Sequence, residues 1–225
     1  MFFEVYSESS KTGDIGLAES SDGITWNYKQ IVITEPFHLS YPYVFKWKEH
    51  YYMVPESNED LSVRIYRSRN FPTEWEYIGN LLTGYHFVDP TIIRYKNLWW
   101  LLVSTRENDA LNLYYSADIL GPWQQHPKNP VVKNNNKISR PGGSLLLFND
   151  KLYRYAQDDS SIYGKQVFVF EITALSEKSY KEKIVSDVPI VKEGNKAWNV
   201  YGMHTVCPVF TRENGWIAGV DGNGK

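Results

Sequence analysis

The sequence has a single cysteine, no long apolar run and no excess of either charge. Cys207 stands alone, which excludes a disulfide within the chain and any zinc site built from several cysteines. No apolar stretch approaches the roughly 20 residues that a membrane-spanning helix needs. The N-terminal segment MFFEVYSESS lacks the basic start and the small-residue cleavage site of a signal peptide. We therefore expect a cytoplasmic protein without a membrane span.

Acidic and basic residues nearly balance. The 225 residues include 24 Lys and Arg against 26 Asp and Glu, for a net charge of −2, and no basic run occurs. This gives no electrostatic footprint for nucleic acid or for an anionic membrane. No closely spaced set of His and carboxylates indicates a metal, although the adjacent Asp158 and Asp159 could hold a cation. We expect no cofactor.

Aromatic residues are abundant in this chain. They number 8 Trp, 17 Tyr and 10 Phe, or 16% of the residues. Such residues favour β-strands, and they also line sugar sites, so the excess fits both a β fold and a sugar ligand. Tyr41, Tyr43 and Trp198 are candidates for stacking on sugar rings.

A repeat of 48 residues runs through the middle of the chain. When residues 40–76 are laid over residues 88–124 without a gap, similar residues coincide along the whole stretch. The coinciding pairs are Pro42 and Pro90, Trp47 and Tyr95, Tyr52 and Trp100, Glu59 and Glu107, Tyr66 and Tyr114, Ser68 and Ser116, and Trp75 and Trp123. A repeat of this length indicates a fold built from copies of one unit.

Each copy reads as four short strands. In the first copy these are residues 42–47, 51–56, 63–68 and a strand that begins at Trp75; in the second they are residues 90–95, 99–104, 111–116 and a strand that begins at Trp123. Four short antiparallel strands in 40 to 50 residues are typical of a propeller blade. The fold class that we predict is therefore all-β, a propeller of four-stranded blades.

Weaker copies flank the clear pair. MFFEV and DIGLAE read as strands near the N-terminus, RPGGSLLLF and LYRYAQD as a hairpin with Asn149-Asp150 at its turn, and HTVCPVF and GWIAGV as a hairpin around Asn214-Gly215. We predict a single five-bladed domain over residues 1–225, incomplete at one or both termini. Its blades would be residues 1–34 (partial), 38–83, 86–132, 138–192 and 202–225 (partial). A four-bladed ring and a β-sandwich with a chance repeat are the alternatives.

Polar residues recur where the first strand of each copy begins and where the second ends. In a blade these two points open on the same rim of the channel, so we expect the residues to share one mouth, as in sites carried on a rigid scaffold. Two or three carboxylates facing one cavity suit glycoside hydrolysis, and the candidate catalytic residues are Asp89, Glu56 and Asp158. The candidate substrate-binding residues are His38, Tyr41, Arg106, Arg140, Gln157, His204 and Asp221.

Each candidate also has a structural reading. Asp89-Pro90 can form a turn that starts a strand. Glu56 can pair with Arg140 or Arg106, and His204 beside a strand can simply be a packed histidine. An arginine on the rim suits a ligand carboxylate or phosphate. Gly142-Gly143 indicates a close approach of strands rather than a phosphate site, because no helix follows it.

Several motifs resemble those of known families. V-D-P (88–90), S-x-D-G-x-T-W (20–26) and G-P-W (121–123) resemble motifs of the family-43-like glycosidases, the five-bladed propellers of the arabinanase, levansucrase and invertase kind. A closer resemblance covers nearly the whole chain. It is to the propeller region of plant glucosamine inositolphosphorylceramide transferases and their bacterial relatives, some linked to surface-polysaccharide synthesis. Its motifs, in order, are FFE, DIGLAESSDGITW, EPFHLSYPYVF, YYMVPES, FP-x-x-W, GPW-x-x-HP-x-NP, RPGG, YAQD and GMHT…VDG.

The glycosidase resemblance implies only part of a hydrolytic site. It makes Asp89 the carboxylate that tunes the acid and orients the substrate. The base of that clan lies on a strand before the start of this sequence, and its acid is a Glu where this sequence reads Ser139-Arg140-Pro141. We therefore predict a glycoside hydrolase-like, carbohydrate-active propeller that engages a glycan or an activated sugar, such as a nucleotide-sugar, at its mouth. The alternatives are a non-catalytic glycan-binding or accessory domain of a glycosyltransferase or surface-polysaccharide system, and a protein-interaction propeller.

Overall fold

The structure is a computed structural model that describes residues 1–211 and 215–224. Within these ranges the regular secondary structure is almost entirely β-strand, with two three-residue 3-10 helices, η1 (Asn58–Asp60) and η2 (Ala197–Asn199). Neither of these two helices has the length to cross a bilayer. The predicted turn at Asn214-Gly215 falls partly on Asn214, which lies outside the described residues.

The chain forms two compact units, each described by itself below. The first unit comprises Met1–Pro90 and Ala117–Trp123, and the second comprises Thr91–Ser116 and Gln124–Lys225. All the sheets pair their strands in antiparallel fashion wherever the register is given. The fold class is therefore all-β, as the sequence predicts.

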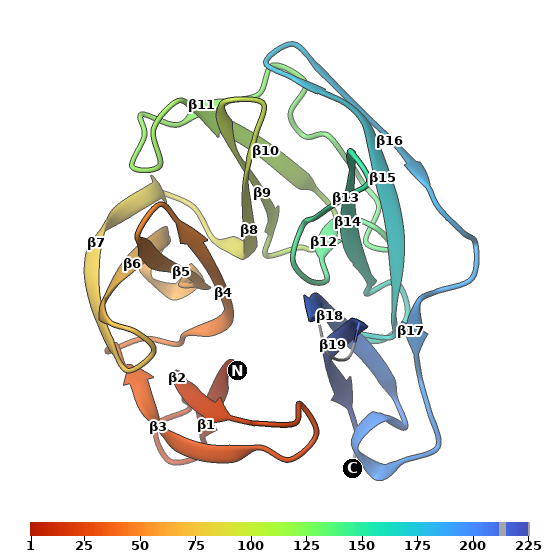
Figure 1. The fold of residues 1–225 in the computed structure, drawn as a ribbon. Coiled ribbons are helices and arrows are strands. Elements are labelled where there is room, and N and C mark those ends of the chain that lie inside the picture. The colour runs from red at the N-terminus through yellow and green to blue at the C-terminus, as the bar shows by residue number, and fades with distance from the viewer. Residues whose placement is uncertain (212–214, 225) are drawn as a thin grey trace. The chain divides into compact units, whose positions relative to one another are not determined.

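Two sheets lie in the first unit (Figure 1). One has the order β1-β2-β3 and the other the order β4-β5-β6-β7. Their strands are β1 (Phe2–Ser7), β2 (Thr12–Glu19), β3 (Asn27–Ile33), β4 (Ser40–Trp47), β5 (His50–Glu56), β6 (Ser62–Asn70) and β7 (Glu74–Thr83). Sequential strands are neighbours in both sheets, which is the meander that each predicted repeat requires.

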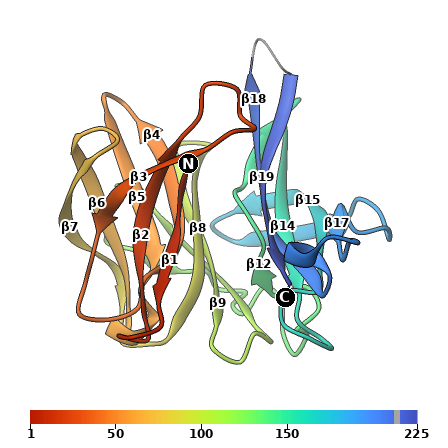
Figure 2. The ribbon, with the colours of Figure 1, turned by 90° about the horizontal axis from the view of Figure 1, so that it is seen from below.

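Three further sheets follow. The first has the order β11-β10-β9-β8, and its strand β8 runs from the first unit into the second. The others are a sheet around β12-β14-β15-β16, with β13 paired to β14 and β17 to β15, and the two-stranded hairpin β18-β19 (Figure 2). The strands are β8 (Phe87–Tyr95), β9 (Leu98–Thr105), β10 (Leu111–Ser116), β11 (Gln124–Gln125), β12 (Arg140–Pro141), β13 (Leu146–Phe148), β14 (Lys151–Asp158), β15 (Gln166–Ser176), β16 (Ser179–Ile184), β17 (Val191–Lys192), β18 (Gly202–Thr211) and β19 (Gly215–Asn223).

Tight turns explain where two hairpins fold back. Asn149 and Asp150 have φ of 49° and 60°, and they join β13 directly to β14. Lys96 and Asn97, with φ of 49° and 66°, join β8 to β9 in the same way. Two consecutive left-handed residues are what a two-residue hairpin needs to match the twist of its strands. The turn predicted at Asn149-Asp150 is confirmed.

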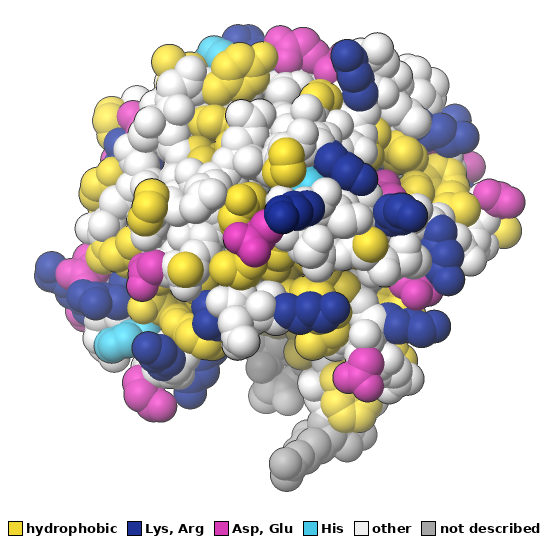
Figure 3. Space-filling view, turned by 90° about the horizontal axis from the view of Figure 1, so that it is seen from above, with side chains coloured by type: hydrophobic (Ala, Val, Ile, Leu, Met, Phe, Trp, Pro, Cys, Tyr) yellow, Lys and Arg dark blue, Asp and Glu magenta, His cyan; other side chains and the backbone are white. Residues whose placement is uncertain are grey.

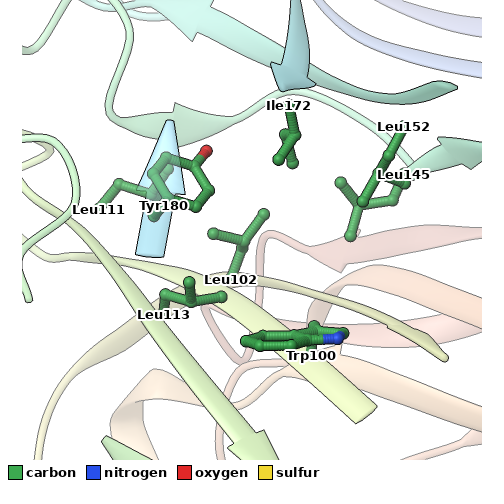
Figure 4. Packing of buried hydrophobic residues seen from close by; sticks show 8 residues of the cluster. All are labelled: Trp100, Leu102, Leu111, Leu113, Leu145, Leu152, Ile172 and Tyr180. Atoms are coloured by element: carbon green, nitrogen blue, oxygen red, sulfur yellow. The ribbon is translucent and has the colours of Figure 1, made fainter. Parts of the chain in front are cut away.

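Each unit has its own apolar core. In the first, Ile15, Leu39 and Met53 are fully buried and pack with Ile33 and Tyr66. In the second, side chains of β9 and β10 meet those of β14, β15 and β16, with Leu102 near the centre of the cluster (Figure 4). Burying one such side chain stabilises a fold by about 2 kcal/mol, so these alternating apolar positions specify which face of each strand points inward.

The predicted strand RPGGSLLLF is interrupted. It divides into β12 and β13 at Gly142 and Gly143, whose backbones lie against β18. The Val206 amide donates to the Gly142 carbonyl at 2.8 Å, and a Cβ at Gly143 would lie 1.9 Å from the Val206 carbonyl oxygen. The close strand approach predicted for this glycine pair is confirmed, and it explains the break.

Charged side chains of both signs are interspersed on the face shown in Figure 3. This agrees with the near-zero net charge of the sequence. A mixed surface of this kind has no broad field of one sign to steer a polyanion toward it.

Candidate functional site

The predicted site residues fall into both units. His38, Tyr41, Glu56 and Asp89 belong to the first unit, and Arg106, Arg140, Gln157, Asp158, His204 and Asp221 belong to the second. Within each unit the structure brings several of them together. The two groups differ in burial and in chemistry.

Glu56 and Asp89 form a buried carboxylate pair in the first unit. Glu56 ends β5 and Asp89 lies on β8, and the two residues are only 5% and 3% exposed. The Asp89 backbone amide donates to Glu56 Oε2 at 2.9 Å, and the Asn58 side-chain amide donates to Glu56 Oε1. A carboxylate excluded from water needs such donors, because leaving a buried charge unsatisfied costs several kcal/mol. Glu56 therefore holds the backbone at Asp89 in place.

Asp89 also has a strained backbone, and the equivalent residue in the other copy of the repeat has the same strain. Its φ is 49°, in the left-handed region that residues with a side chain seldom adopt, and it precedes Pro90. Tyr41, its counterpart one repeat earlier, precedes Pro42 and has φ of 45°. The ladder between β4 and β5 is irregular at this point, between Ser40 and Tyr43. Strain of about 1–3 kcal/mol at such residues persists where the surroundings fix it, which is frequent at functional sites.

His38 is locked by its surroundings in the first unit. Its Nδ1 accepts a hydrogen bond from the Gly13 amide at 2.9 Å, so the proton of the neutral ring is on Nε2. Nε2 lies 3.6 Å from Glu4 Oε1, and the His38 backbone amide donates to Glu59 Oε2 at 2.9 Å. A side chain at Gly13 would collide with this arrangement. These contacts give His38 a fixed tautomer and orientation.

Asp158, in the second unit, organises the loop that follows β14. Its Oδ1 accepts from the Ser160 amide at 3.0 Å and from the Ser160 hydroxyl, and its Oδ2 accepts from Gln166 Nε2 at 2.8 Å. Burial raises the pKa of Asp158, but the hydrogen bonds from Ser160 and Gln166 outweigh it and hold the pKa below its ordinary value. Asp158 is therefore an ionised carboxylate with bonds to both oxygens. Its neighbour Gln157 is 1% exposed and donates to the Pro141 carbonyl at 2.8 Å.

Arg140 lies over the ring of Tyr163 in the second unit. Its guanidinium carbon is 5.0 Å from the ring centroid, and Nη1 is 3.9 Å from Asp159 Oδ2. Asp159 Oδ1 accepts from the Gly164 amide at 2.8 Å, which closes the loop around Tyr163. The side chain of Arg140 is only 13% exposed, whereas Tyr163 is 49% exposed. Arginine stacks well on aromatic faces, so Arg140 supports one face of this tyrosine.

His204 contacts the same tyrosine and also Asp221. The rings of Tyr163 and His204 have centroids 5.1 Å apart, and His204 Nε2 lies 3.0 Å from Asp221 Oδ2. The β18-β19 register shifts between Met203 and Thr205, so His204 is at an irregularity of the kind that re-aims a side chain. We name the five residues Asp159, Arg140, Tyr163, His204 and Asp221 the tyrosine cluster.

The position of His204 leaves it little freedom. Gly164 has φ of 65°, and a Cβ there would lie 2.7 Å from the His204 Cβ and 2.9 Å from Nδ1. Nδ1 is buried and has no hydrogen-bond partner among the described residues. The Nε2–H tautomer, donating to Asp221, satisfies these contacts because a proton on Nδ1 would be buried without an acceptor.

Sequence reasoning found Arg140, His204 and Asp221 but missed Tyr163. The signal was present as an aromatic residue followed by glycine in the polar loop DDSSIYG, between two strands. Arg106, which the sequence also nominates, is exposed in the turn after β9. Over residues 1–211 and 215–224, no three His, Cys, Asp or Glu side chains group closely enough to hold a metal ion.

The two groups suit different chemistry. The Glu56–Asp89 pair offers buried carboxylates whose geometry is fixed by the backbone. The tyrosine cluster offers a half-exposed ring beside a carboxylate, Asp221, whose side chain is 55% exposed. Where the glycosidase resemblance expects a general acid, Ser139 is fully buried and its hydroxyl donates to the Asn135 carbonyl at 2.6 Å.

Solved structures of glycosidases have similar folds. An exo-1,5-α-L-arabinanase from a bovine ruminal metagenomic library aligns with a TM-score of 0.67 at 12% identity, over 100% of this chain and 83% of its own. An exo-β-1,3-galactanase from Clostridium thermocellum aligns at 0.65 and 14%, over 96% and 50%. A family 117 glycoside hydrolase from Zobellia galactanivorans aligns at 0.62 and 16%, over 96% and 71%. The chain thus has the propeller-like all-β fold of these glycosidases, as the first resemblance implies.

Sequence comparison identifies nearer relatives. Glucosamine inositolphosphorylceramide transferase 1 from Oryza sativa subsp. japonica is 38% identical over 99% of this chain and 31% of its own length. The protein of that name from Arabidopsis thaliana is 34% identical over 99% of this chain and 30% of its own length. The chain therefore spans about a third of the curated relatives that it matches. The family described as glucosamine inositolphosphorylceramide transferase 1, N-terminal, matches residues 1–223, and this chain belongs to that family.

Proposed function

We propose that this chain is a carbohydrate-recognition propeller, in which the five sheets are the blades and a glycan or activated sugar binds where their first strands begin. The range of each sheet falls within one predicted blade, and the fold is shared with glycosidases. Membership of a family named after a transferase supports a role beside a glycosyltransferase activity. In such a role the propeller would present the sugar or glycan, and chemistry would belong to another part of the protein.

The observation that carries this proposal is the buried, strained Asp89. A carboxylate 3% exposed, on a left-handed residue before proline, costs stability twice, through desolvation and through backbone strain. Glu56 holds the strained backbone by accepting the Asp89 amide. A fold that needed only a turn at this point could use glycine there without the strain. A role for the carboxylate itself explains why aspartate is present.

Binding is favoured over hydrolysis by what surrounds the carboxylates. The position of the expected acid is occupied by Ser139, Arg140 and Pro141. Asp158 has hydrogen bonds to both oxygens and a lowered pKa, which suits a structural anion more than a proton donor at neutral pH. Glycoside hydrolysis by a carboxylate pair needs one member that is protonated at the working pH.

Glycoside hydrolysis is the second candidate, favoured by one observation. Glu56 and Asp89 are two buried acidic residues, and Glu56 Oε2 accepts a hydrogen bond from the Asp89 backbone amide, so two carboxyl-bearing side chains belong to one part of the first unit. If the protein hydrolyses a glycan, these two residues are the ones that we expect to carry the acid and base roles.

A binding screen with Asp89→Asn separates these functions. The wild-type chain would be screened by thermal shift against glycans and nucleotide-sugars, and each hit assayed for hydrolysis. We expect binding without hydrolysis, and a loss of about tenfold or more in affinity for Asp89→Asn. Its melting temperature should stay within about 2 °C of wild type, since Asn tolerates the left-handed region.

The exposed Asp187→Asn is the matched control and should change neither quantity. Hydrolysis abolished by Asp89→Asn would establish the second candidate instead. The absence of any sugar ligand would contradict both candidates and favour a protein-interaction propeller.

A further inference from the structure

The tyrosine cluster has the composition of a subsite for one sugar ring, and this inference rests on the proposed carbohydrate recognition. Tyr163 is 49% exposed, and Arg140 and His204 both contact its ring. A half-exposed tyrosine supported by two neighbours is a rigid apolar platform with a polar tip. The C–H face of a pyranose is a suitable partner for such a platform.

The carboxylate beside this platform is held ready for hydroxyl groups. His204 Nε2 donates to Asp221 Oδ2 at 3.0 Å, while the Asp221 side chain stays 55% exposed. Carboxylates accept strong, charge-assisted hydrogen bonds from hydroxyls. Because His204 Nδ1 is buried against Gly164, the edge of the ring opposite Asp221 is fixed. His204 is a positioning residue for Asp221.

The charges of the cluster select among sugars. Arg140 contributes one positive charge, and Asp159 and Asp221 contribute one negative charge each. Arg140 lies over the Tyr163 ring, and its Nη1 is 3.9 Å from Asp159 Oδ2. The exposed charge near Tyr163 is instead that of Asp221. A carboxylate or phosphate on the ligand would meet this negative charge at close range, which is unfavourable. The sequence favoured an anionic ligand for Arg140, and the contacts of Arg140 point the other way.

We propose that Tyr163 and Asp221, positioned by Arg140 and His204, form a subsite that takes an uncharged hydroxylated sugar ring and discriminates against acidic sugars. Tyr163 stacks on the ring, and Asp221 accepts its hydroxyls. The loop between Asp159 and Gly164 holds the platform through the Asp159–Gly164 hydrogen bond of 2.8 Å.

The test measures binding of immobilised neutral glycans and of the same glycans carrying uronic acids. We expect Tyr163→Ala to weaken binding of the neutral set about tenfold, and Tyr163→Phe, which keeps the ring, to weaken it less than about twofold. Tyr201→Ala is the matched control, because Tyr201 is 47% exposed in the same unit and lies outside the cluster. It should bind as wild type does.

Asp221→Asn tests the selectivity separately. It keeps the shape of the side chain and removes the charge, so the preference for neutral over acidic glycans should fall at least about fivefold. If wild type binds neutral glycans and Tyr163→Ala binds them equally well, the subsite is wrong while the proposed function stands. If acidic glycans bind wild type better than neutral ones, the charge argument is overturned. If no glycan binds wild type, the proposed function fails, and this inference with it.

Discussion

The carboxylates of the two units are held in opposite ways. Asp89 is 3% exposed and its position is set by backbone: a left-handed residue before proline whose amide is bound by Glu56. Asp221 has a side chain 55% exposed and is oriented by another side chain, His204. The first arrangement spends stability to keep a charge buried, and the second costs little because water still solvates the group.

This difference determines which changes each group tolerates. In the first unit, removing one hydrogen-bond acceptor leaves buried donors without a partner, which lowers the stability of the fold. In the second, the critical element is the close packing of a loop on His204, so added volume is the damaging change. Three predictions test this contrast.

The largest effect is expected for Glu56→Ala. It leaves the Asp89 amide and the Asn58 side chain without their buried acceptor, which should lower the free energy of unfolding by about 3 kcal/mol. Thermal unfolding measures this as a fall of about 6–12 °C in melting temperature. Hydrogen exchange should place the loss in the first unit. For the exposed Glu177→Ala, the free energy of unfolding should stay within about 0.5 kcal/mol of the wild-type value. An equal loss of stability in both variants would contradict the special role of Glu56.

An intermediate effect is expected for Gly164→Ala. The new Cβ would lie 2.7 Å from the His204 Cβ, at a φ of 65° that favours glycine. Strain and displacement of His204 together should cost about 2 kcal/mol, measured by denaturant unfolding. Gly219→Ala is the control, because nothing lies within 4 Å of a Cβ there. A tolerated Gly164→Ala would show that the loop can move away from His204.

The smallest effect concerns pH. The pKa of Asp158 is lower in the folded chain than its ordinary value of 3.8, so the unfolded chain binds its proton first as pH falls. Asp158 therefore contributes stability that is fully present above about pH 4–5 and is lost as pH falls through the folded pKa. Asp158→Asn should flatten the fall in unfolding free energy below pH 4, whereas Asp187→Asn should leave it unchanged. An unaltered acid limb in Asp158→Asn would mean that its hydrogen bonds do not favour the ionised form.

Much of the fold could be predicted because residues close together in the sequence indicate the strands and turns of each copy of the repeat. The repeat marked 51–56 and 63–68, which lie in β5 and β6, and Asn149-Asp150 marked a hairpin. These features depend on neighbours in sequence, where side-chain periodicity and turn preferences act. The number of blades in a closed ring stays a prediction, since it depends on how the sheets are arranged about one axis.

The site was only partly accessible from sequence. Arg140, His204 and Asp221 were nominated by their place in the repeat, but Tyr163 belongs to the loop between β14 and β15, whose residues differ from those of the equivalent loops 57–61 and 106–110. Its contacts with Arg140 and His204 join residues from separate strands, and no local pattern encodes such a meeting. The contact of Arg140 with the Tyr163 ring could not be seen in the sequence either, and its role in binding an anionic ligand stays a prediction.

The glycine pair at 142–143 has a consequence for motion. Gly142 receives the Val206 amide, and the Val206 carbonyl leaves no room for a side chain at Gly143, so the backbone beside Arg140 and the backbone beside His204 are fastened to each other. Neither can shift alone without breaking this contact. When a ligand arrives, the two supports of Tyr163 therefore keep their spacing. Recognition at the tyrosine cluster would then be the fit of a ligand onto a stationary base, with little rearrangement of the protein.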